Sequence, residues 1–194
     1  MGICQRASSL LRAVKNRFGL RSFIRKKLAV LYKTKITIGL VPCAVGGSSI
    51  EQWIADSTYR DITLYSNLID KARKASAYGT IKGILWHQGE TNASTGNYKN
   101  YKEKLEFFFT KLRNDLGDSD LPVYAGQLGS FLDRKTNLFA DSINNDLNKL
   151  SASFKNFYII NTSDLTPKPD SIHFNSRSQR IMGERFAKLV YKTH

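Results

Sequence analysis

The sequence predicts a single α/β domain in which a parallel sheet is covered by helices on both faces. Short apolar strands alternate with amphipathic helices along most of the chain, and this alternation is typical of parallel sheets. The 194 residues suffice for one domain with a substantial core and are too few for two ordinary domains. Hydrophobic residues make up 41% of the chain, which excludes a disordered or collagen-like protein.

The regular pattern begins with an apolar, β-branched run over residues 36–41, which predicts a buried strand. A glycine-containing loop follows at 44–49. Apolar residues then recur at helical spacing over 62–76, and Gly79 is placed to end that helix. Residues 81–86 predict the second strand.

The same unit repeats along the rest of the chain. Apolar stripes predict helices over 98–116 and 139–154, with a strand-like segment at 121–128 between them. Residues 157–161 predict the last strand, and Ser176 begins the capping-box spacing of a final helix. In folds of this class, functional residues gather in the loops beyond the carboxyl ends of the strands.

The positive charge is concentrated at the start of the chain. The formal net charge is +14, and residues 1–50 contain ten basic residues and no acidic one. Residues 51–194 contain 20 basic and 16 acidic residues, which is an ordinary balance for a domain that handles small molecules. We therefore divide the chain into a basic helical N-terminal segment, residues 1–35, and a globular domain, residues 36–194.

The N-terminal segment has several interpretations. Its apolar residues predict two short helical pieces, at 11–18 and 24–31. A solvated basic helix is one interpretation, and the alternatives are an organellar transit peptide, a helix on an anionic membrane surface and an arm that binds nucleic acid. No transmembrane segment is predicted, because no apolar run is long enough to span a bilayer, and no signal peptide is predicted, because Arg21 interrupts the only stretch that could form its apolar core. The localisation stays open.

No cofactor is expected. The two cysteines, Cys4 and Cys43, lie in dissimilar surroundings without C-x-x-C spacing, so the sequence predicts neither a disulfide framework nor a zinc site. No other cluster of ligand residues indicates a metal.

Two of the predicted loops contain residues suited to stabilise an oxyanion. Gly46 and Gly47 follow the first strand, and glycines let backbone N–H groups approach a ligand closely. Gln88 follows the second strand, and its amide can donate a further hydrogen bond. The alternative is that the glycine pair only makes a turn, since it lacks both G-x-G-x-x-G and the Walker lysine of nucleotide sites.

A histidine and two carboxylates are candidates for acid–base chemistry. In Asp170-x-x-His173, the carboxylate is close enough in sequence to orient the imidazole and stabilise its protonated form, as acyl transfer requires. Glu90 offers a carboxylate for the same role from the loop of Gln88. The alternative for Asp170 and His173 is a turn at the entry to a helix.

Three blocks of the sequence occur in an order that is specific to one family. They read IGLVPCAVGGSSIEQW at residues 38–53, GILWHQGETNA at 83–93 and DSIHF at 170–174. Together they resemble the sialic-acid-specific acetylesterase and acetylxylan esterase family, which lies within the SGNH hydrolases. The resemblance covers residues 28–191. It implies a flavodoxin-like three-layer α/β/α sandwich, so that residues 36–194 form an SGNH-hydrolase-like carbohydrate esterase domain.

The resemblance also implies an activity and residue roles. Family members remove O-acetyl groups from carbohydrates with a serine nucleophile and need no metal, so the implied partner is an acetylated carbohydrate. His173 is similar in position to the general base, and Gly47 and Gln88 to the oxyanion donors. For this branch the resemblance favours Glu90 as the partner of His173, whereas Asp170 matches the wider superfamily. Both carboxylates stay open.

The chain departs from the family at the nucleophile. Members begin with a strand that ends in a G-Q-S-N-M-like segment, and nothing in residues 1–35 matches it. Ser8 has no predicted strand before it, and Ser48 and Ser49 lie in the block of oxyanion donors, so the nucleophile is unknown. The family's first strand is internal in the sheet, and its apparent loss is expected to leave a neighbouring strand with unpaired backbone groups.

Three hypotheses follow for the function. The first is a carbohydrate O-acetylesterase whose sequence is truncated or rearranged at its start and which is therefore inactive or slow. The second is a non-catalytic carbohydrate-binding relative. The third assigns the function to the basic segment, which would bind nucleic acid or an anionic membrane.

Overall fold

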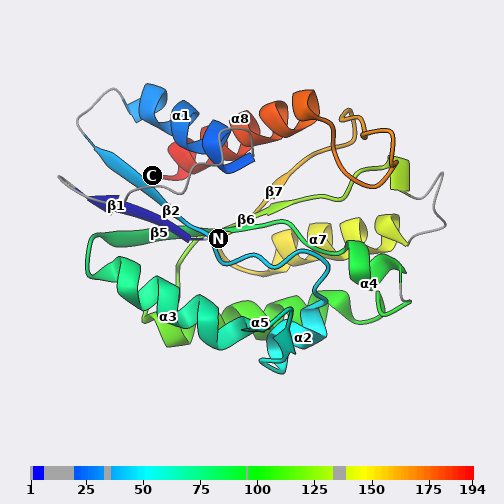
Figure 1. Ribbon diagram of the computed structural model, residues 1–194, viewed down its shortest axis with the longest axis horizontal. Coiled ribbons are helices and arrows are strands. Elements are labelled where there is room, and N and C mark those ends of the chain that lie inside the picture. Colours follow the sequence, from blue (N-terminus) through cyan, green and yellow to red (C-terminus); the bar gives the residue numbers. More distant parts are fainter. Residues whose placement is uncertain (1, 7–19, 33–35, 95, 133–138) are drawn as a thin grey trace.

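A computed structural model of the chain describes residues 2–6, 20–32, 36–94, 96–132 and 139–194. These residues form three layers, with one sheet between two layers of helices (Figure 1). This arrangement confirms the predicted α/β sandwich. The helical piece expected at residues 11–18 lies outside the described residues.

The main sheet has five strands in the order β2-β1-β5-β6-β7. In chain order they are β1 (Gly2–Arg6), β2 (Thr37–Val41), β5 (Thr80–Trp86), β6 (Val123–Gly126) and β7 (Phe157–Ile160). The last three strands pair in parallel, whereas β1 is antiparallel to both of its neighbours. A separate two-stranded sheet joins β3 (Thr58–Tyr59) to β4 (Ile62–Thr63).

The expected gap at the centre of the sheet is not present, because β1 fills it. Gly2 lies opposite Val41 of β2 on one side and Ile84 of β5 on the other. Each unpaired buried backbone group would cost about 1–3 kcal/mol, so a strand in this position stabilises the sheet. Sequence analysis missed β1 because its run of five residues is short and ends in Gln5 and Arg6. The family's first strand is still unmatched, since β1 runs in the opposite direction to β5.

One face of the sheet is covered by α1 (Leu20–Tyr32) and α8 (Ser176–Thr193) (Figure 1). Ile24 and Leu28 of α1 are buried in the same core as the rest of the domain. The boundary expected between residues 35 and 36 therefore does not separate two cores in the described part of the chain. The α8 cap also differs from the prediction, because Asn175 accepts the hydrogen bond from Ser178 N and is the N-cap in place of Ser176.

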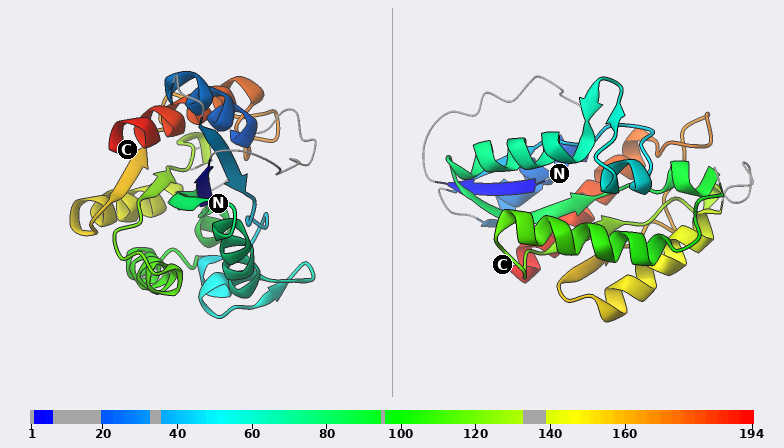
Figure 2. Two further views of the ribbon diagram at one scale, coloured as in Figure 1. Left: turned by 90° about the vertical axis from the view of Figure 1, so that its left-hand side faces the viewer. Right: turned by 90° about the horizontal axis from the view of Figure 1, so that it is seen from below.

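The other face is covered by five helices, which lie in front of the sheet in the right-hand view of Figure 2. They are α2 (Ile50–Ile54), α3 (Leu64–Ser76), α4 (Glu90–Ser94), α5 (Tyr101–Leu116) and α7 (Ala140–Ser153). The predicted helix over 62–76 begins two residues late, because residues 62–63 pair in β4. No helix within the described ranges is both long and apolar enough to span a bilayer.

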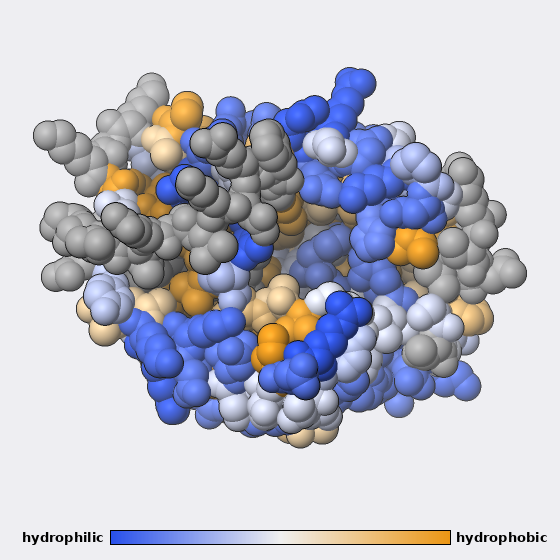
Figure 3. Space-filling view, in the orientation of Figure 1, coloured by the Kyte–Doolittle hydropathy of each residue, from blue (hydrophilic) through white to orange (hydrophobic). Residues whose placement is uncertain are grey.

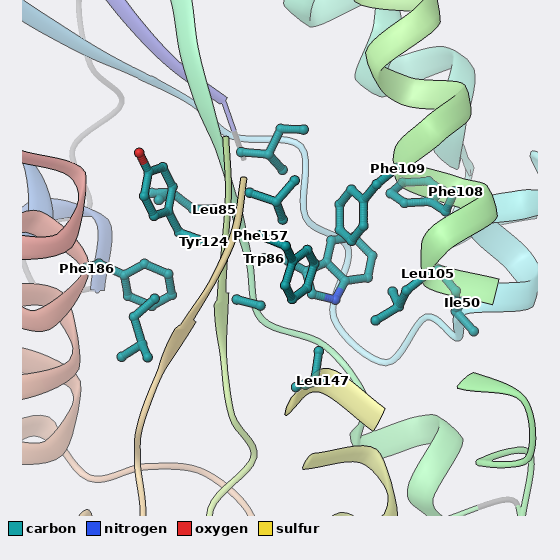
Figure 4. Close-up of a cluster of buried hydrophobic side chains, with 14 of the residues drawn as sticks. Ile50, Leu85, Trp86, Leu105, Phe108, Phe109, Tyr124, Leu147, Phe157 and Phe186 are labelled. Carbon is teal, nitrogen blue, oxygen red and sulfur yellow. The ribbon is translucent and has the colours of Figure 1, made fainter. Parts of the chain in front are cut away.

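The strands place alternate side chains in cores on the two faces of the sheet (Figure 4). Leu85 lies with Tyr124 and Phe186 on the side of α8. Trp86 lies on the other side, where its ring is 5.3 Å from those of Phe108 and Phe109 of α5. These aromatic contacts hold the end of β5 in place, and the β5 loop that follows therefore starts from a rigid position.

Candidate active site

The three sequence blocks meet at one edge of the sheet. The hydroxyl of Thr91, in the segment after β5, donates to the Gly47 carbonyl at 3.0 Å, which joins that segment to the loop after β2. The rings of His87 and Phe174 lie 5.8 Å apart, which joins the β5 loop to the loop after β7. These contacts link the three loops that carry Gly47, Gln88 and His173 at the carboxyl ends of the strands.

His173 and Asp170 form a hydrogen-bonded pair in the β7 loop. His173 Nδ1 lies 3.0 Å from Asp170 Oδ2, and Asp170 Oδ1 accepts the backbone N–H groups of Ile172 and His173 at 2.9 Å each. The hydrogen bonds from the backbone of His173 and Ile172, and then from the His173 ring, lower the pKa of Asp170 to about 2. Because an ionised carboxylate only accepts, Nδ1 carries the proton and Nε2 is the basic nitrogen.

The pair is exposed at the surface, with 68% of the His173 side chain accessible to solvent. The backbone holds the loop, because Lys168 N donates to the His173 carbonyl at 2.7 Å and Pro167 forms an isolated bridge with Phe174. His173 Nε2 has no hydrogen-bond partner among the described residues. The imidazole is therefore oriented from one side and open to a ligand on the other.

Glu90 lies beside a different histidine. Its Oε1 is 3.7 Å from Nε2 of His87, whose Nδ1 is 3.1 Å from the Gly126 carbonyl. A Cβ on Gly126 would lie 3.0 Å from His87 Nδ1, so the close approach of this ring depends on a glycine there. Of the two carboxylates left open by the sequence, Asp170 is the one that contacts His173.

Gln88 is placed at the site, but both hydrogens of its amide are already donated. Nε2 lies 3.1 Å from the Ser48 carbonyl and 2.8 Å from Asn92 Oδ1. The Tyr101 hydroxyl donates to Gln88 Oε1 at 2.8 Å and fixes the orientation of the amide. Burial raises the pKa of Tyr101, so this hydroxyl stays protonated. In this arrangement Gln88 ties two loops together, and it would have to exchange one of its bonds to stabilise an oxyanion.

The glycine pair retains free donors. The backbone N–H groups of Gly46 and Gly47 make no hydrogen bond within the described part of the chain. Gly47 has φ +85°, a left-handed conformation that favours glycine, and a Cβ there would lie 3.0 Å from the Tyr59 hydroxyl. These N–H groups suit an oxyanion better than the Gln88 amide does.

Ser48 is a structural residue. It is 3% exposed, its hydroxyl donates to the Val45 carbonyl at 2.7 Å, and it accepts the Trp53 indole N–H at 2.8 Å. Ser49 caps α2 by accepting a hydrogen bond from Gln52 N. The hydroxyls of both serines are therefore engaged in hydrogen bonds within the chain. Ser8 lies outside the described residues, although β1 precedes it.

The direction of β1 separates its carboxyl end from the site. Because β1 is antiparallel to β2 and β5, Arg6 lies opposite Thr37 and Gln5 opposite Thr80, at the amino ends of those strands. The chain therefore leaves β1 at the edge opposite His173. Among the described residues, no side-chain hydroxyl forms a hydrogen bond with His173, and no group of three His, Cys, Asp or Glu side chains is placed to hold a metal ion.

Sequence analysis did not find the residue that organises the β5 loop. Asn92 is fully buried, and its Oδ1 accepts Ile50 N at 3.0 Å while its Nδ2 donates to both oxygens of Glu51. Partial burial raises the pKa of Glu51, but hydrogen bonds from Lys104 and Asn92 outweigh this effect and leave the pKa below its usual value. The only sequence signal was the position of Asn92 two residues after Glu90.

A small apolar cavity of about 60 Å³ lies between the ends of β2 and β5 and the helices behind them. Val45, Trp53, Trp86 and Phe108 contribute to its lining. Cys43 also lines it, but burial raises the pKa of the Cys43 thiol, so Cys43 is not an activated nucleophile. Figure 3 shows the face of the molecule hollowed between its two helical layers. The cavity is large enough for a group as small as an acetyl methyl.

Comparisons with known proteins agree on the kind of protein. Residues 10–192 match the family model described as "Carbohydrate esterase, sialic acid-specific acetylesterase". The chain is similar to a probable carbohydrate esterase of Arabidopsis thaliana, with 26% identity over 156 residues. That alignment covers 78% of this chain and 54% of the plant protein, so the chain spans about half the length of this curated relative.

Solved structures support the same conclusion. An X-ray structure of a protein from Arabidopsis thaliana has a TM-score of 0.71 and 26% identity, covering 89% of this chain and 67% of that one. A carbohydrate acetylesterase from Xanthomonas citri has a TM-score of 0.71 and 25% identity, covering 90% of this chain and 41% of that one. NanS, at 17% identity and a TM-score of 0.57 over 71% of this chain and 55% of its own, shares the fold.

Proposed function

The chain belongs to the family of carbohydrate esterases described as sialic acid-specific acetylesterases, and we propose that its site binds O-acetylated carbohydrates with His173 as the general base. The observation that carries this proposal is the 3.0 Å contact between His173 Nδ1 and Asp170, which leaves Nε2 basic and open to a ligand. Asp170 orients the ring and stabilises the imidazolium that forms when Nε2 takes a proton.

The proposed reaction is the hydrolysis of an acetyl ester. His173 Nε2 takes a proton from an attacking hydroxyl, which adds to the acetyl carbonyl, and the N–H groups of Gly46 and Gly47 stabilise the oxyanion. The tetrahedral intermediate expels the sugar oxygen, which takes the proton back from the imidazolium. With a serine as the attacking group, an acyl-enzyme forms. Water then attacks its carbonyl as His173 takes the water proton, and the serine oxygen leaves with that proton as acetate is released.

We further propose that this chain hydrolyses acetyl esters slowly or not at all. No hydroxyl of the described residues forms a hydrogen bond with His173, and a site that retains its oxyanion donors without a positioned nucleophile keeps only a small part of the rate enhancement. A water molecule activated by His173 would supply the residual rate. The same observation favours a second candidate function, the binding of acetylated carbohydrates without turnover.

Acetate release and ligand binding, measured together, test both candidates. With a p-nitrophenyl or sugar acetate, we expect turnover well below the range of about 1–1000 per second that is typical of enzymes. Any residual turnover should be lost in His173→Ala and kept in His194→Ala, a histidine replacement at the end of α8. Saturable binding of an acetylated sugar without turnover supports the binding function.

Two results would overturn parts of the proposal. Turnover within the enzymatic range would show that a serine supplies the nucleophile, and Ser8→Ala, Ser48→Ala and Ser49→Ala would then identify it. If the chain neither binds nor hydrolyses any acetylated carbohydrate, the assignment of the site is wrong.

A further inference from the structure

The two helical layers differ in charge. The pair α1 and α8 contains nine basic residues and a single acidic one, Glu184. The five helices on the opposite face, α2, α3, α4, α5 and α7, contain eight basic and eight acidic residues. The excess of positive charge therefore lies in the layer formed by α1 and α8.

The exposed side of α8 carries a row of unpaired cations. Arg177, Arg180, Lys188 and Lys192 are exposed, and their spacing of three, eight and four residues places them on one side of the helix. None of the four forms an ion pair with a described residue. Arg185 lies on the same helix but is held by Asp164, at 2.7 Å to each carboxylate oxygen. We call these four exposed residues the α8 row.

The α8 row extends about 22 Å at the rise of an α-helix, and α1 adds charge beside it. Arg180 lies over the Phe23 ring of α1 at 5.9 Å, and the rings of Tyr32 and Tyr191 meet at 5.1 Å. The two helices are therefore in contact along much of their length. Arg25 and Lys26 of α1 are exposed, and Tyr191 presents an aromatic ring to solvent on the same side as the α8 row.

The α8 row begins at the site. Arg177 is four residues after His173, and Asn175 between them is the N-cap of α8. Lys168 is exposed on the other side of His173 in sequence, and its backbone N–H donates to the His173 carbonyl. An anionic chain that occupies the site can therefore continue along the α8 row, where the exposed Glu184, between Arg180 and Lys188, is the one acidic side chain of α8.

We infer that the α8 row binds the carboxylates of an acidic polysaccharide, one unit of which lies at His173. This inference rests on the proposed function, because the carbohydrate class of the ligand comes from the site. The charge comes from the structure, since a neutral polysaccharide would gain nothing from four unpaired cations. Nucleic acid would match the charge but would have no reason to begin at an ester site, and the exposed side of α8 carries no apolar residue besides Tyr191 for insertion into a membrane.

A pair of charge-reversal variants tests the inference on the full chain. Arg177→Glu with Lys188→Glu reverses two members of the α8 row, neither of which forms an ion pair with a described residue. Arg73→Glu with Lys74→Glu makes the same change in net charge on α3, in the opposite layer. The probe is an oligogalacturonate without acetyl groups, titrated at low salt, with a neutral xylo-oligosaccharide for comparison.

The α8 variant should raise the dissociation constant for oligogalacturonate at least about tenfold, and the α3 variant should change it less than about twofold. Added salt should weaken binding to the unmodified chain and leave the α8 variant less affected. An equal loss of affinity for oligogalacturonate in the two variants would show that only the net charge matters, and it would overturn the inference. Equal affinity for the acidic and neutral oligosaccharides would overturn it too, as would tighter binding of duplex DNA or phosphatidylserine vesicles than of oligogalacturonate.

The result is separable from the proposed function. His173→Ala tests the ester site through acetate release, which it should abolish, whereas Arg177→Glu with Lys188→Glu tests the α8 row through the affinity for unacetylated oligogalacturonate, which should fall at least about tenfold. If the acidic polymer binds but no acetylated sugar is bound or hydrolysed, binding by the α8 row is supported and the proposed ester site is rejected. If acetylated neutral sugars bind at His173 and the acidic polymer does not, the ester site stands and the inference fails.

Discussion

The loop after β5 and the loop after β7 meet at the site, but they hold their polar groups in opposite ways. In the β5 loop, Asn92 is fully buried, and the side-chain amide of Gln88 donates both of its hydrogens, to the Ser48 carbonyl and to Asn92 Oδ1. In the β7 loop, Asp170 and His173 are exposed and bond mainly to each other. The comparison teaches that polar residues of two neighbouring loops can have different roles, because buried polar groups must be satisfied by the protein whereas exposed groups remain available to a ligand.

Removing the centre of the buried network should produce the largest effect. Asn92→Ala deprives Ile50 N, Gln88 and Glu51 of hydrogen bonds in a buried place, and we expect the free energy of unfolding to fall by about 2–4 kcal/mol. Urea unfolding measures this change. Asn145→Ala, at an exposed position of α7, is the matched control and should change stability by less than about 0.5 kcal/mol. A similar, small effect of both variants would contradict the structural role of the β5 loop.

A smaller loss is expected from Ser48→Ala. This change leaves the Trp53 indole N–H without its acceptor in the core, and we expect a loss of about 1–2 kcal/mol. Thermal or urea unfolding measures it. The comparison variant is Ser153→Ala, whose exposed hydroxyl bonds within α7 and should contribute less. Unchanged stability of Ser48→Ala would mean that its hydroxyl is free for another purpose, and Ser48 would return as a candidate nucleophile.

The smallest effect on stability should come from the β7 loop and should depend on pH. The pKa of Asp170 in the folded chain, about 2, lies below the value near 4 of an unfolded aspartate. Its contribution is therefore fully present above about pH 4 and is lost as the pH falls toward 2. The difference in stability between the unmodified chain and Asp170→Asn, followed by urea unfolding, should shrink over that interval.

The control for this pH dependence is Asp61→Asn, since Asp61 is exposed and accepts no hydrogen bond from a described residue. The difference in stability between Asp61→Asn and the unmodified chain should vary less with pH than the difference for Asp170→Asn. A difference for Asp170→Asn that grows as the pH falls would have the wrong sign for a carboxylate stabilised by backbone N–H groups.

The same contrast explains what the sequence could predict. The pairing of Asp170 with His173 is local, because they are three positions apart, and the alternation of strands and helices is a periodic pattern, so both were visible in the sequence. The partners of Gln88 include Ser48 and Tyr101, which tertiary folding brings to it, and no spacing in the sequence reveals them. The short strand Gly2–Arg6 was missed for a related reason, since its place in the sheet depends on pairing with residues 31 to 82 positions away.

The central claim is that an acetylated carbohydrate binds at His173, and histidine NMR tests it without requiring turnover. The chain has three histidines, and only His173 has its basic nitrogen open at the site, whereas His194 Nε2 lies 2.8 Å from the Lys82 carbonyl at the end of α8. Titration with an O-acetylated sugar should shift the His173 ring resonances most, His87 less through Phe174, and His194 not at all. The deacetylated sugar should produce smaller shifts. Equal shifts at His173 and His194, or no shift at His173 when the sugar is bound, would contradict the account.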